Sequence, residues 1–156
     1  MSQYGLAELS GGAGDDIMSG GGANINFYGA DMDGGEGDDH MLGSIGDDDM
    51  FGGPGNDFLF GKAGSDEIHG GSGDDILKGG NFPNAMGTDV LRGGAGNDKL
   101  YSGFDAFDAV YGYGEFKYLY GDEGDDTLYG SFFTSNEFFW GGAGDDTIYG
   151  GSGTLD

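Results

Sequence analysis

Residues 52–78 read GGPGNDFLF-GKAGSDEIH-GGSGDDILK, three units of nine residues that follow one another without a gap. Two further units, GGEGDDHML from Gly34 and GSIGDDDMF from Gly43, precede them directly, so the repeat is unbroken over 34–78. Clean copies also occur at 11–19, 93–101, 121–129 and 141–149. A short fixed period predicts a repeat architecture in which each unit packs on its neighbours.

The shared pattern is G-G-x-G-x-D-x-U-x, in which U is a large apolar residue. Positions one to six predict a tight turn, because glycine adopts the positive φ angles that other residues resist. Positions seven to nine predict a three-residue strand whose alternation points position eight inward. Two units then make one coil, and the strands stack about 4.8 Å apart. The sequence therefore predicts an all-β fold, a right-handed parallel β-roll (solenoid) of about seven two-repeat coils.

The repeat predicts a single β-roll domain over residues 1–156, with insertions where the units are degenerate. These insertions are expected near 20–33, 79–92, 102–111 and 130–140. The first stretch can be read as one long unit or as one unit plus an insertion. The third is interpreted as a unit of its own, followed by a regular unit over 112–120 that has Lys117 where Asp belongs.

The chain is too acidic to collapse without a counter-charge. Asp and Glu number 29 against 5 Lys and Arg, which gives a formal charge of −24. One inward side chain per unit makes a thin core against an ordering cost of roughly 1–2 kcal/mol per residue. The chain is therefore either disordered or completed by a cation, and the fixed phase of the apolar residues favours the second. The charge argues against nucleic acid and anionic membranes as partners.

Several classes of site and segment are absent from the sequence. There is no Cys, which excludes disulfides and thiolate metal sites. No apolar run is long enough to span a bilayer. The first residues, MSQYGL, lack the basic and apolar regions of a cleavable signal peptide.

Stacked turns bring the position-six aspartates into two ladders. Asp39, Asp57 and Asp75 form one, and Asp48 and Asp66 begin the other. Carboxylates stacked this closely repel, and an all-oxygen shell of carboxylates and backbone carbonyls favours Ca²⁺ over Mg²⁺. About ten such sites would bring roughly +20 charges and nearly neutralise the chain. The candidate carboxylate ligands are Asp16, Asp39, Asp48, Asp57, Asp66, Asp75, Asp89, Asp98, Asp108, Asp126 and Asp146.

These nonapeptides resemble the RTX (repeats-in-toxin) family of secreted bacterial proteins over nearly the whole chain. The resemblance implies that each ion lies between turns two units apart, bound by two position-six aspartates and by carbonyls of positions two and four of one turn and one and three of the other. The implied sets are Asp39, Gly35 and Gly37 with Asp57, Gly52 and Pro54; Asp48, Ser44 and Gly46 with Asp66, Gly61 and Ala63; Asp57, Gly53 and Gly55 with Asp75, Gly70 and Ser72; and Asp75, Gly71 and Gly73 with Asp98, Gly93 and Ala95.

The resemblance also implies an extracellular protein, exported by type I secretion and folded by calcium outside the cell. Lys117 and Glu137 depart from the pattern. Lys117 is expected to replace a calcium ion on the ladder between Asp98 and Glu137.

Aromatic residues recur at position nine in the second half of the chain. The predicted stacking puts Tyr101, Tyr120 and Trp140 on one sheet and Tyr111, Tyr129 and Tyr149 on the other. They either stabilise the sheets by packing or form a contact surface for a protein or glycan.

No catalytic constellation is recognisable, because His40 and His69 fall at outward positions and every Asp pair recurs with the repeat. The chain is therefore predicted to be non-enzymatic. The favoured function is a structural or self-assembly module that associates end to end. The alternative is a calcium-dependent module of a larger toxin, adhesin or enzyme that binds a glycan or a cell surface.

Overall fold

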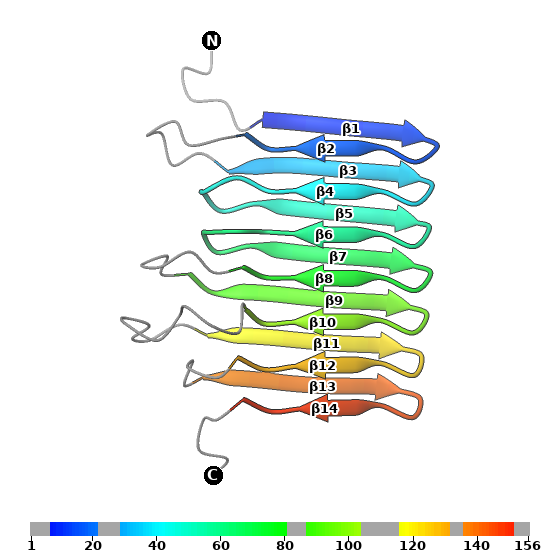
Figure 1. Cartoon of the computed structure of the whole chain (residues 1–156), viewed down its shortest axis with the longest axis vertical. Helices are drawn as coiled ribbons and strands as arrows, with labels where there is room; N and C mark the ends of the chain where they lie inside the picture. The colour runs from blue at the N-terminus through cyan, green and yellow to red at the C-terminus, as the bar shows by residue number, and fades with distance from the viewer. Residues whose placement is uncertain (1–6, 22–28, 81–86, 104–115, 132–135, 152–156) are drawn as a thin grey trace.

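The computed structural model describes residues 7–21, 29–80, 87–103, 116–131 and 136–151. These residues form two parallel sheets of seven strands each, stacked coil upon coil (Figure 1). They contain no helix long and apolar enough to cross a membrane. The predicted all-β parallel β-roll with about seven coils is thereby confirmed.

Strands of two lengths alternate along the chain. The odd-numbered strands form the long sheet, with β1 (Ala7–Ala13), β3 (Ala30–Glu36), β5 (Asp49–Pro54), β7 (Glu67–Ser72), β9 (Asp89–Ala95), β11 (Lys117–Glu123) and β13 (Glu137–Ala143). The even-numbered strands form the short sheet, with β2 (Ile17–Ser19), β4 (His40–Leu42), β6 (Phe58–Phe60), β8 (Ile76–Lys78), β10 (Lys99–Tyr101), β12 (Thr127–Tyr129) and β14 (Thr147–Tyr149).

The short strands match the predicted three residues at positions seven to nine, whereas all the long strands continue to position three of the next unit. They continue because the paired glycines remain extended enough to hydrogen-bond with the neighbouring coil, as Gly53 does opposite Gly71. Gly53 has a φ of 108°, and a Cβ there would collide with the carbonyl oxygen of Gly35. Glycine is therefore required at this position by both conformation and space.

The core is a single file of apolar side chains, nearly all from position eight, enclosed between the sheets. Its buried members are Met18, Ala30, Met32, Met41, Met50, Leu59, Ile68, Leu77, Leu91, Leu100, Leu119 and Leu128, with Leu9 and Phe139 packed against them. Ile148 in the last described coil stays 46% exposed.

The roll has two different edges. At the constant edge, on the right of Figure 1, each long strand turns into the next short strand through three residues, 14–16, 37–39, 55–57, 73–75, 96–98, 124–126 and 144–146. At the variable edge, each short strand leads to the next long strand through six residues at 43–48 and 61–66 and through more elsewhere. All the extra residues of the degenerate units thus fall between a short strand and the following long one.

The register of β11 corrects the reading of residues 102–120. Lys117 pairs with Asp89, and 28 residues separate Asp98 from its ladder neighbour Asp126, where a regular coil has 18. Residues 102–120 are therefore one unit with ten extra residues, and the predicted division into two units was wrong. The ladder neighbour of Lys117 is consequently Asp89, and the predicted neighbour Asp98 lies on the other edge.

The same correction moves the aromatic residues. Tyr101, Tyr129 and Tyr149 share the short sheet, while Tyr120 and Trp140 share the long sheet. The predicted grouping of Tyr101 with Tyr120 and Trp140 was wrong, and the predicted place of Tyr111 lies outside the described residues.

Candidate metal sites on the two edges

An unbroken ladder of aspartates lies along the constant edge. Its members, all at position six, are Asp16, Asp39, Asp57, Asp75, Asp98, Asp126 and Asp146. From Asp39 onward, the Oδ1 of each accepts a hydrogen bond from the backbone N–H of the ladder residue in the preceding coil, at 2.8–3.1 Å. The interior members are only 1–2% exposed. One carboxylate oxygen of each interior residue is thus used to hold adjacent coils together.

The second carboxylate oxygen on this edge has a different environment. Among the described residues, the Oδ2 atoms of Asp16, Asp39, Asp57, Asp75, Asp98 and Asp126 are buried without a hydrogen-bond partner. Each lies against the position-one glycine of its own unit and beside a carbonyl oxygen of the next coil. At Gly34, for example, a Cβ would collide with both Asp39 Oδ2 and the Gly52 carbonyl oxygen.

This convergence of a carboxylate and a carbonyl oxygen is the donor set that a hard cation takes. A buried carboxylate oxygen without a partner is costly, and native proteins rarely leave one without an ion or water. The residues present on the constant edge therefore fit a calcium ion.

Burial raises the pKa of the ladder carboxyls, and the neighbouring carboxylates raise it further. The pKa of Asp75 rises to about 7 and that of Asp98 to about 6, in each case mainly by desolvation. The pKa values of Asp57 and Asp126 are raised for the same reasons. The fold therefore brings together acidic groups whose ionisation a cation lying among them would favour.

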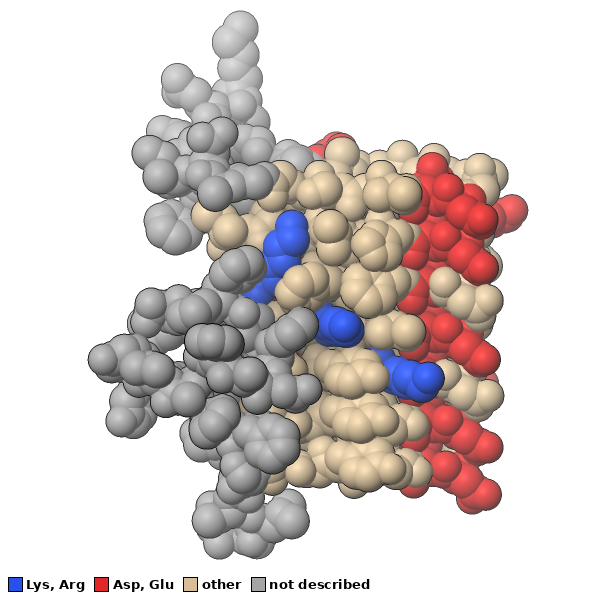
Figure 2. Space-filling view, in the orientation of Figure 1, with Lys and Arg blue, Asp and Glu red and all other residues tan. Residues whose placement is uncertain are grey.

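A second, exposed ladder lies beside the first. At position five, Asp15, Asp38, Asn56, Asp74, Asn97 and Asp125 each accept through Oδ1 the backbone N–H of the next coil, at 2.7–3.0 Å. Figure 2 shows acidic side chains gathered along this edge. The outer ladder adds further negative charge to this edge and links the turns of adjacent coils by hydrogen bonds.

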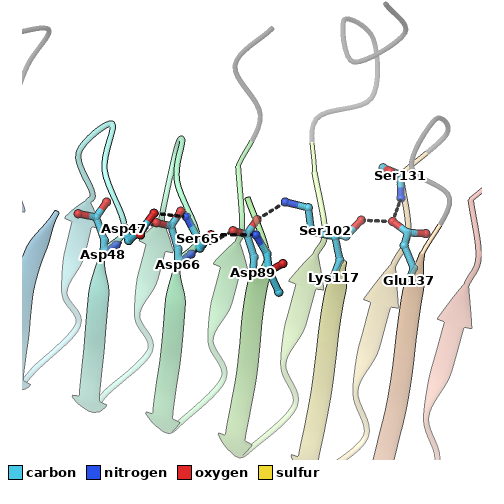
Figure 3. Close-up of polar contacts among 10 residues, drawn as sticks. Asp47, Asp48, Ser65, Asp66, Asp89, Ser102, Lys117, Ser131 and Glu137 are labelled. Atoms are coloured by element: carbon cyan, nitrogen blue, oxygen red, sulfur yellow. Dashed lines mark hydrogen bonds and ion pairs between the residues drawn. The ribbon is translucent and has the colours of Figure 1, made fainter. Parts of the chain in front are cut away.

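The ladder on the variable edge is interrupted (Figure 3). Its positions are occupied by Ala30, Asp48, Asp66, Asp89, Lys117 and Glu137. Only Asp66 repeats the arrangement of the constant edge, with a buried Oδ2 that has no partner in the described structure and the Gly79 carbonyl beside it. Desolvation, followed by the charge of Asp89, raises the pKa of Asp66 to about 8.

The other carboxylates of this edge are bonded within the chain. Asp48 accepts the Ser44 N–H at 2.6 Å, the Ser44 hydroxyl at 2.8 Å and the Ala30 N–H at 2.6 Å. Asp89 accepts the Asp66 N–H at 3.1 Å and the Lys117 ammonium at 2.5 Å. Glu137 accepts the Ser102 hydroxyl at 2.6 Å and the Ser131 N–H at 2.8 Å.

The structure brings together part of each calcium set implied by the resemblance. The carbonyls of Gly52, Gly61, Gly70 and Gly93 lie beside Asp39, Asp48, Asp57 and Asp75, respectively. The implied ligands Gly35, Gly37, Gly53, Gly55, Gly71 and Gly73 all have positive φ in the turns of the constant edge. The carbonyls of Pro54, Ser72 and Ala95 each accept a backbone N–H at 2.7–2.9 Å and keep one lone pair.

The remaining implied ligands, Gly46 and Ala63, lie in the turns of the variable edge, and Asp108 lies outside the described residues. In the described part of the chain, no three His, Cys, Asp or Glu side chains form a metal-binding group. A cation on either edge would therefore need backbone carbonyls as well as carboxylates, as the implied sets do.

Sequence reasoning missed the bonds that close the variable edge. Ser44 and Lys62 both stand at position two, where most of the clean units have glycine, and the Lys62 ammonium donates to the Gly43 carbonyl at 2.5 Å. Lys62 also has a φ of 81°, which is unfavourable for a residue with a side chain. These departures from the consensus were the available signal.

Aromatic side chains stack along the outer faces of both sheets in the second half of the roll. On the long sheet, the Arg92 guanidinium lies 4.4 Å from the Tyr120 ring centre, and Tyr120 stacks on Trp140 at 4.5 Å. Tyr118 stacks on Phe138 at 5.1 Å in the parallel row. On the short sheet, Tyr129 stacks on Tyr101 at 4.7 Å and on Tyr149 at 5.0 Å. The predicted contact residues within the described ranges thus form rows along the roll axis.

The two histidines lie on the outer faces, where His40 stacks on Phe58 at 4.6 Å and His69 bonds to Glu67 at 3.1 Å.

Comparison with known proteins points to one family model. The model of the RTX calcium-binding nonapeptide repeat, which holds four copies of the repeat, matches residues 8–24, 31–59, 51–84, 86–106, 108–132 and 133–154. No curated protein sequence matches the chain significantly. The matched segments include every position-six residue of both ladders except Ala30.

Proposed function

Since the chain belongs to the family of RTX calcium-binding nonapeptide-repeat proteins, we propose that it is a secreted module that folds when it binds extracellular calcium. The family and the fold together identify the chain as a calcium-binding β-roll. The repeat is a structural calcium-binding element and carries no catalytic group of its own. We also propose that the protein is exported by type I secretion.

The observation that carries the proposal is the row of buried, unpartnered Oδ2 atoms along the constant edge. The position-six carboxylates of successive coils would hold each ion, together with backbone carbonyls of the turns. A bound Ca²⁺ supplies the positive charge that lets these carboxyls ionise inside the fold. The core alone is a single file of side chains, so ordering of the chain would depend on this compensation.

Far-ultraviolet circular dichroism tests the proposal directly. In chelator the chain should show the spectrum of a coil, and millimolar calcium should restore the β-sheet spectrum. A β-sheet spectrum that persists unchanged in excess chelator would overturn it.

We further propose that calcium-loaded rolls associate end to end. Inside the roll, the N–H groups at positions four and six donate to the next coil, as Gly124 does to the Ala143 carbonyl and Asp126 does to Asp146. In the last described coil, Gly144 and Asp146 hold these donor positions. In the first described coil, Ala13 and Asp16 hold the matching acceptor positions. The two ends are therefore complementary, and an association that does not close into a ring gives a filament.

Light scattering and negative-stain microscopy test this association. Particle size should grow with protein concentration in calcium, and chelator should return the protein to single chains. Particles that remain single chains at high protein and calcium concentrations would exclude assembly and leave the calcium-binding proposal untouched.

One observation favours a second function, the binding of a glycan or a cell surface. Phe138 and Trp140 on the long sheet, and Phe116 directly before β11, are 40–46% exposed, and aromatic rings of this kind provide contact area for sugars and proteins. A calcium-loaded protein retained on a glycan array, with retention lost in Trp140→Ala but kept in Phe51→Ala, would support it. Phe51 is the matched control because it is 47% exposed on the first half of the same sheet.

A further inference from the structure

The two edges differ in whether their buried carboxylate oxygens have hydrogen-bond partners. Seven buried Oδ2 atoms lack a partner within the described residues, and six of them belong to the constant edge. The seventh belongs to Asp66, whereas the remaining variable-edge carboxylates are bonded to serine or lysine. We propose that calcium binds along the constant edge, while the ammonium groups of Lys117 and Lys62 replace it along most of the variable edge. This inference rests on the proposed calcium-binding function and assigns its ions to positions.

Lys117 provides the stronger part of the evidence. It is 3% exposed, and its Nζ lies 2.5 Å from Asp89 Oδ2. The equivalent Oδ2 atoms of the constant-edge aspartates Asp16 to Asp126 have no hydrogen-bond partner in the described structure. The N–H of Asp89 donates to the Phe116 carbonyl at 3.2 Å instead of to a ladder carboxylate, because residue 117 has none. The ammonium thus supplies, from within the chain, the positive charge that an ion supplies elsewhere.

The contacts between Lys117 and the next ladder residue, Glu137, also differ from those of the constant edge. The N–H of Lys117 donates to the Asn136 carbonyl at 2.9 Å, so it does not take a carboxylate oxygen of Glu137. Glu137 is instead bonded to Ser102, which is fully buried, and to Ser131, which is 1% exposed. Both carboxylates that flank Lys117 therefore have partners without metal.

Lys62 performs the corresponding role near the first coils. Position six of the first described coil on this edge is Ala30, which offers no carboxylate, and the space at Gly20 holds the Ala30 methyl group. The Gly43 carbonyl of the next coil is bonded by the Lys62 ammonium at 2.5 Å. Both carboxylate oxygens of Asp48 accept hydrogen bonds, chiefly from Ser44. Asp48 therefore has no buried, unpartnered oxygen like Asp57 Oδ2.

The variable edge therefore keeps one arrangement like that of the constant edge, at Asp66 and the Gly79 carbonyl. Among the described residues, the unpartnered oxygens support seven calcium positions.

The number of ions bound by a charge-reversed variant tests this assignment. Native mass spectrometry in calcium should show that Lys117→Asp binds at least one ion more than the wild type, because the substitution restores the consensus aspartate opposite Asp89. Lys99→Asp is the matched control, since Lys99 is exposed on β10 and the change in net charge is the same. Equal ion counts for the two folded variants would overturn the proposal.

A measurement on the wild type covers the case in which Lys117→Asp does not fold. In calcium, reductive methylation read by peptide mass spectrometry should label Lys117 at least tenfold more slowly than Lys99. Labelling of both at the same rate would mean that calcium displaces the ammonium, and would overturn the proposal. Persistence of the fold in chelator would refute the calcium-folding proposal instead, so the two failures are distinguishable.

Discussion

The constant and variable edges of this roll solve the same electrostatic problem in different ways. Both bring position-six side chains of successive coils into buried contact, at Asp57 and Asp75 on one edge and at Asp66 and Asp89 on the other. The constant edge keeps every carboxylate and leaves one oxygen of most of them without a partner. The variable edge replaces carboxylates with alanine and lysine, or bonds them to serine. The comparison teaches that a repeat can lose its metal ligands locally when the chain supplies the missing charge or hydrogen bond itself.

The largest effect is expected where the internal cation is removed. In Lys117→Met, the Asp89 carboxylate loses its ammonium partner inside a site that is 1% exposed. Breaking a buried ion pair on one side costs about 3–5 kcal/mol. Urea unfolding in saturating calcium measures the loss. Lys99→Met should have little effect, and Asp89→Asn added to Lys117→Met should recover part of the stability. A Lys117→Met protein as stable as Lys99→Met would contradict the role of the pair.

A smaller but clear effect is expected in the middle of the constant edge. Asp57→Ala removes a carboxylate that stands between two proposed ions, whereas Asp15 lies on the exposed position-five ladder. Calorimetric titration of Asp57→Ala should show at least one lost site and a calcium midpoint raised about tenfold, equivalent to about 1.4 kcal/mol. Asp15→Ala should stay close to the wild type. The ligand assignment is wrong if both variants titrate alike.

Without calcium, acid should favour the fold. The folded pKa values of Asp66, Asp75 and Asp98 lie at about 8, 7 and 6, above the ordinary value of 3.8. The folded chain therefore binds more protons than the unfolded chain, and the stability gained from them is full below about pH 4 and lost as the pH rises to 8.

Circular dichroism of calcium-stripped protein should accordingly show more β-structure at pH 5 than at pH 8. The calcium-loaded protein should respond in the opposite direction, with weaker binding at pH 5 than at pH 8, because protons compete with the ion for the same oxygens. A metal-free spectrum that loses β-structure on acidification would contradict the assigned shifts.

The smallest effect is expected for Ser44, which donates hydrogen bonds to Asp48 on the variable edge. Ser44→Ala removes the hydroxyl bonded to Asp48 Oδ1 but keeps the backbone N–H bonded to Oδ2. A loss of about 0.5–1.5 kcal/mol is expected for one such hydrogen bond. Ser72→Ala is the control, because Ser72 is exposed in the constant edge. Thermal unfolding in calcium distinguishes the two variants. Equal melting temperatures would show that the Ser44 hydroxyl does not stabilise the fold through Asp48.

The fold was predictable because the repeat fixes the phase of every apolar and acidic residue. Met50, Ile68 and Leu91 stack in the expected register, and both aspartate ladders form where position six places them. Calcium as the cation and the position-six carboxylates as its candidate ligands were likewise expected from spacing and chemistry.

The parts that were not predictable lie where the repeat is degenerate. The 19 residues of 102–120 fit either two short units or one long unit, since both keep the flanking units in phase. Only the pairing of Lys117 with Asp89 decides between them, and that pairing depends on contacts between distant coils. The closure of Asp48 by Ser44 is similarly a matter of local turn geometry, which the consensus does not specify.

The location of the extra residues has a consequence for how this protein can be altered. Regular coils repeat every 18 residues, yet ladder neighbours on the constant edge are 23, 28 or 20 residues apart wherever the chain is lengthened, and their hydrogen bonds stay at 2.8–3.1 Å. Every lengthening enters between a short strand and the next long one, so neither sheet loses register. The six-residue connections at 43–48 and 61–66 are therefore natural points for grafting foreign peptides, which would turn the roll into a display scaffold assembled by calcium.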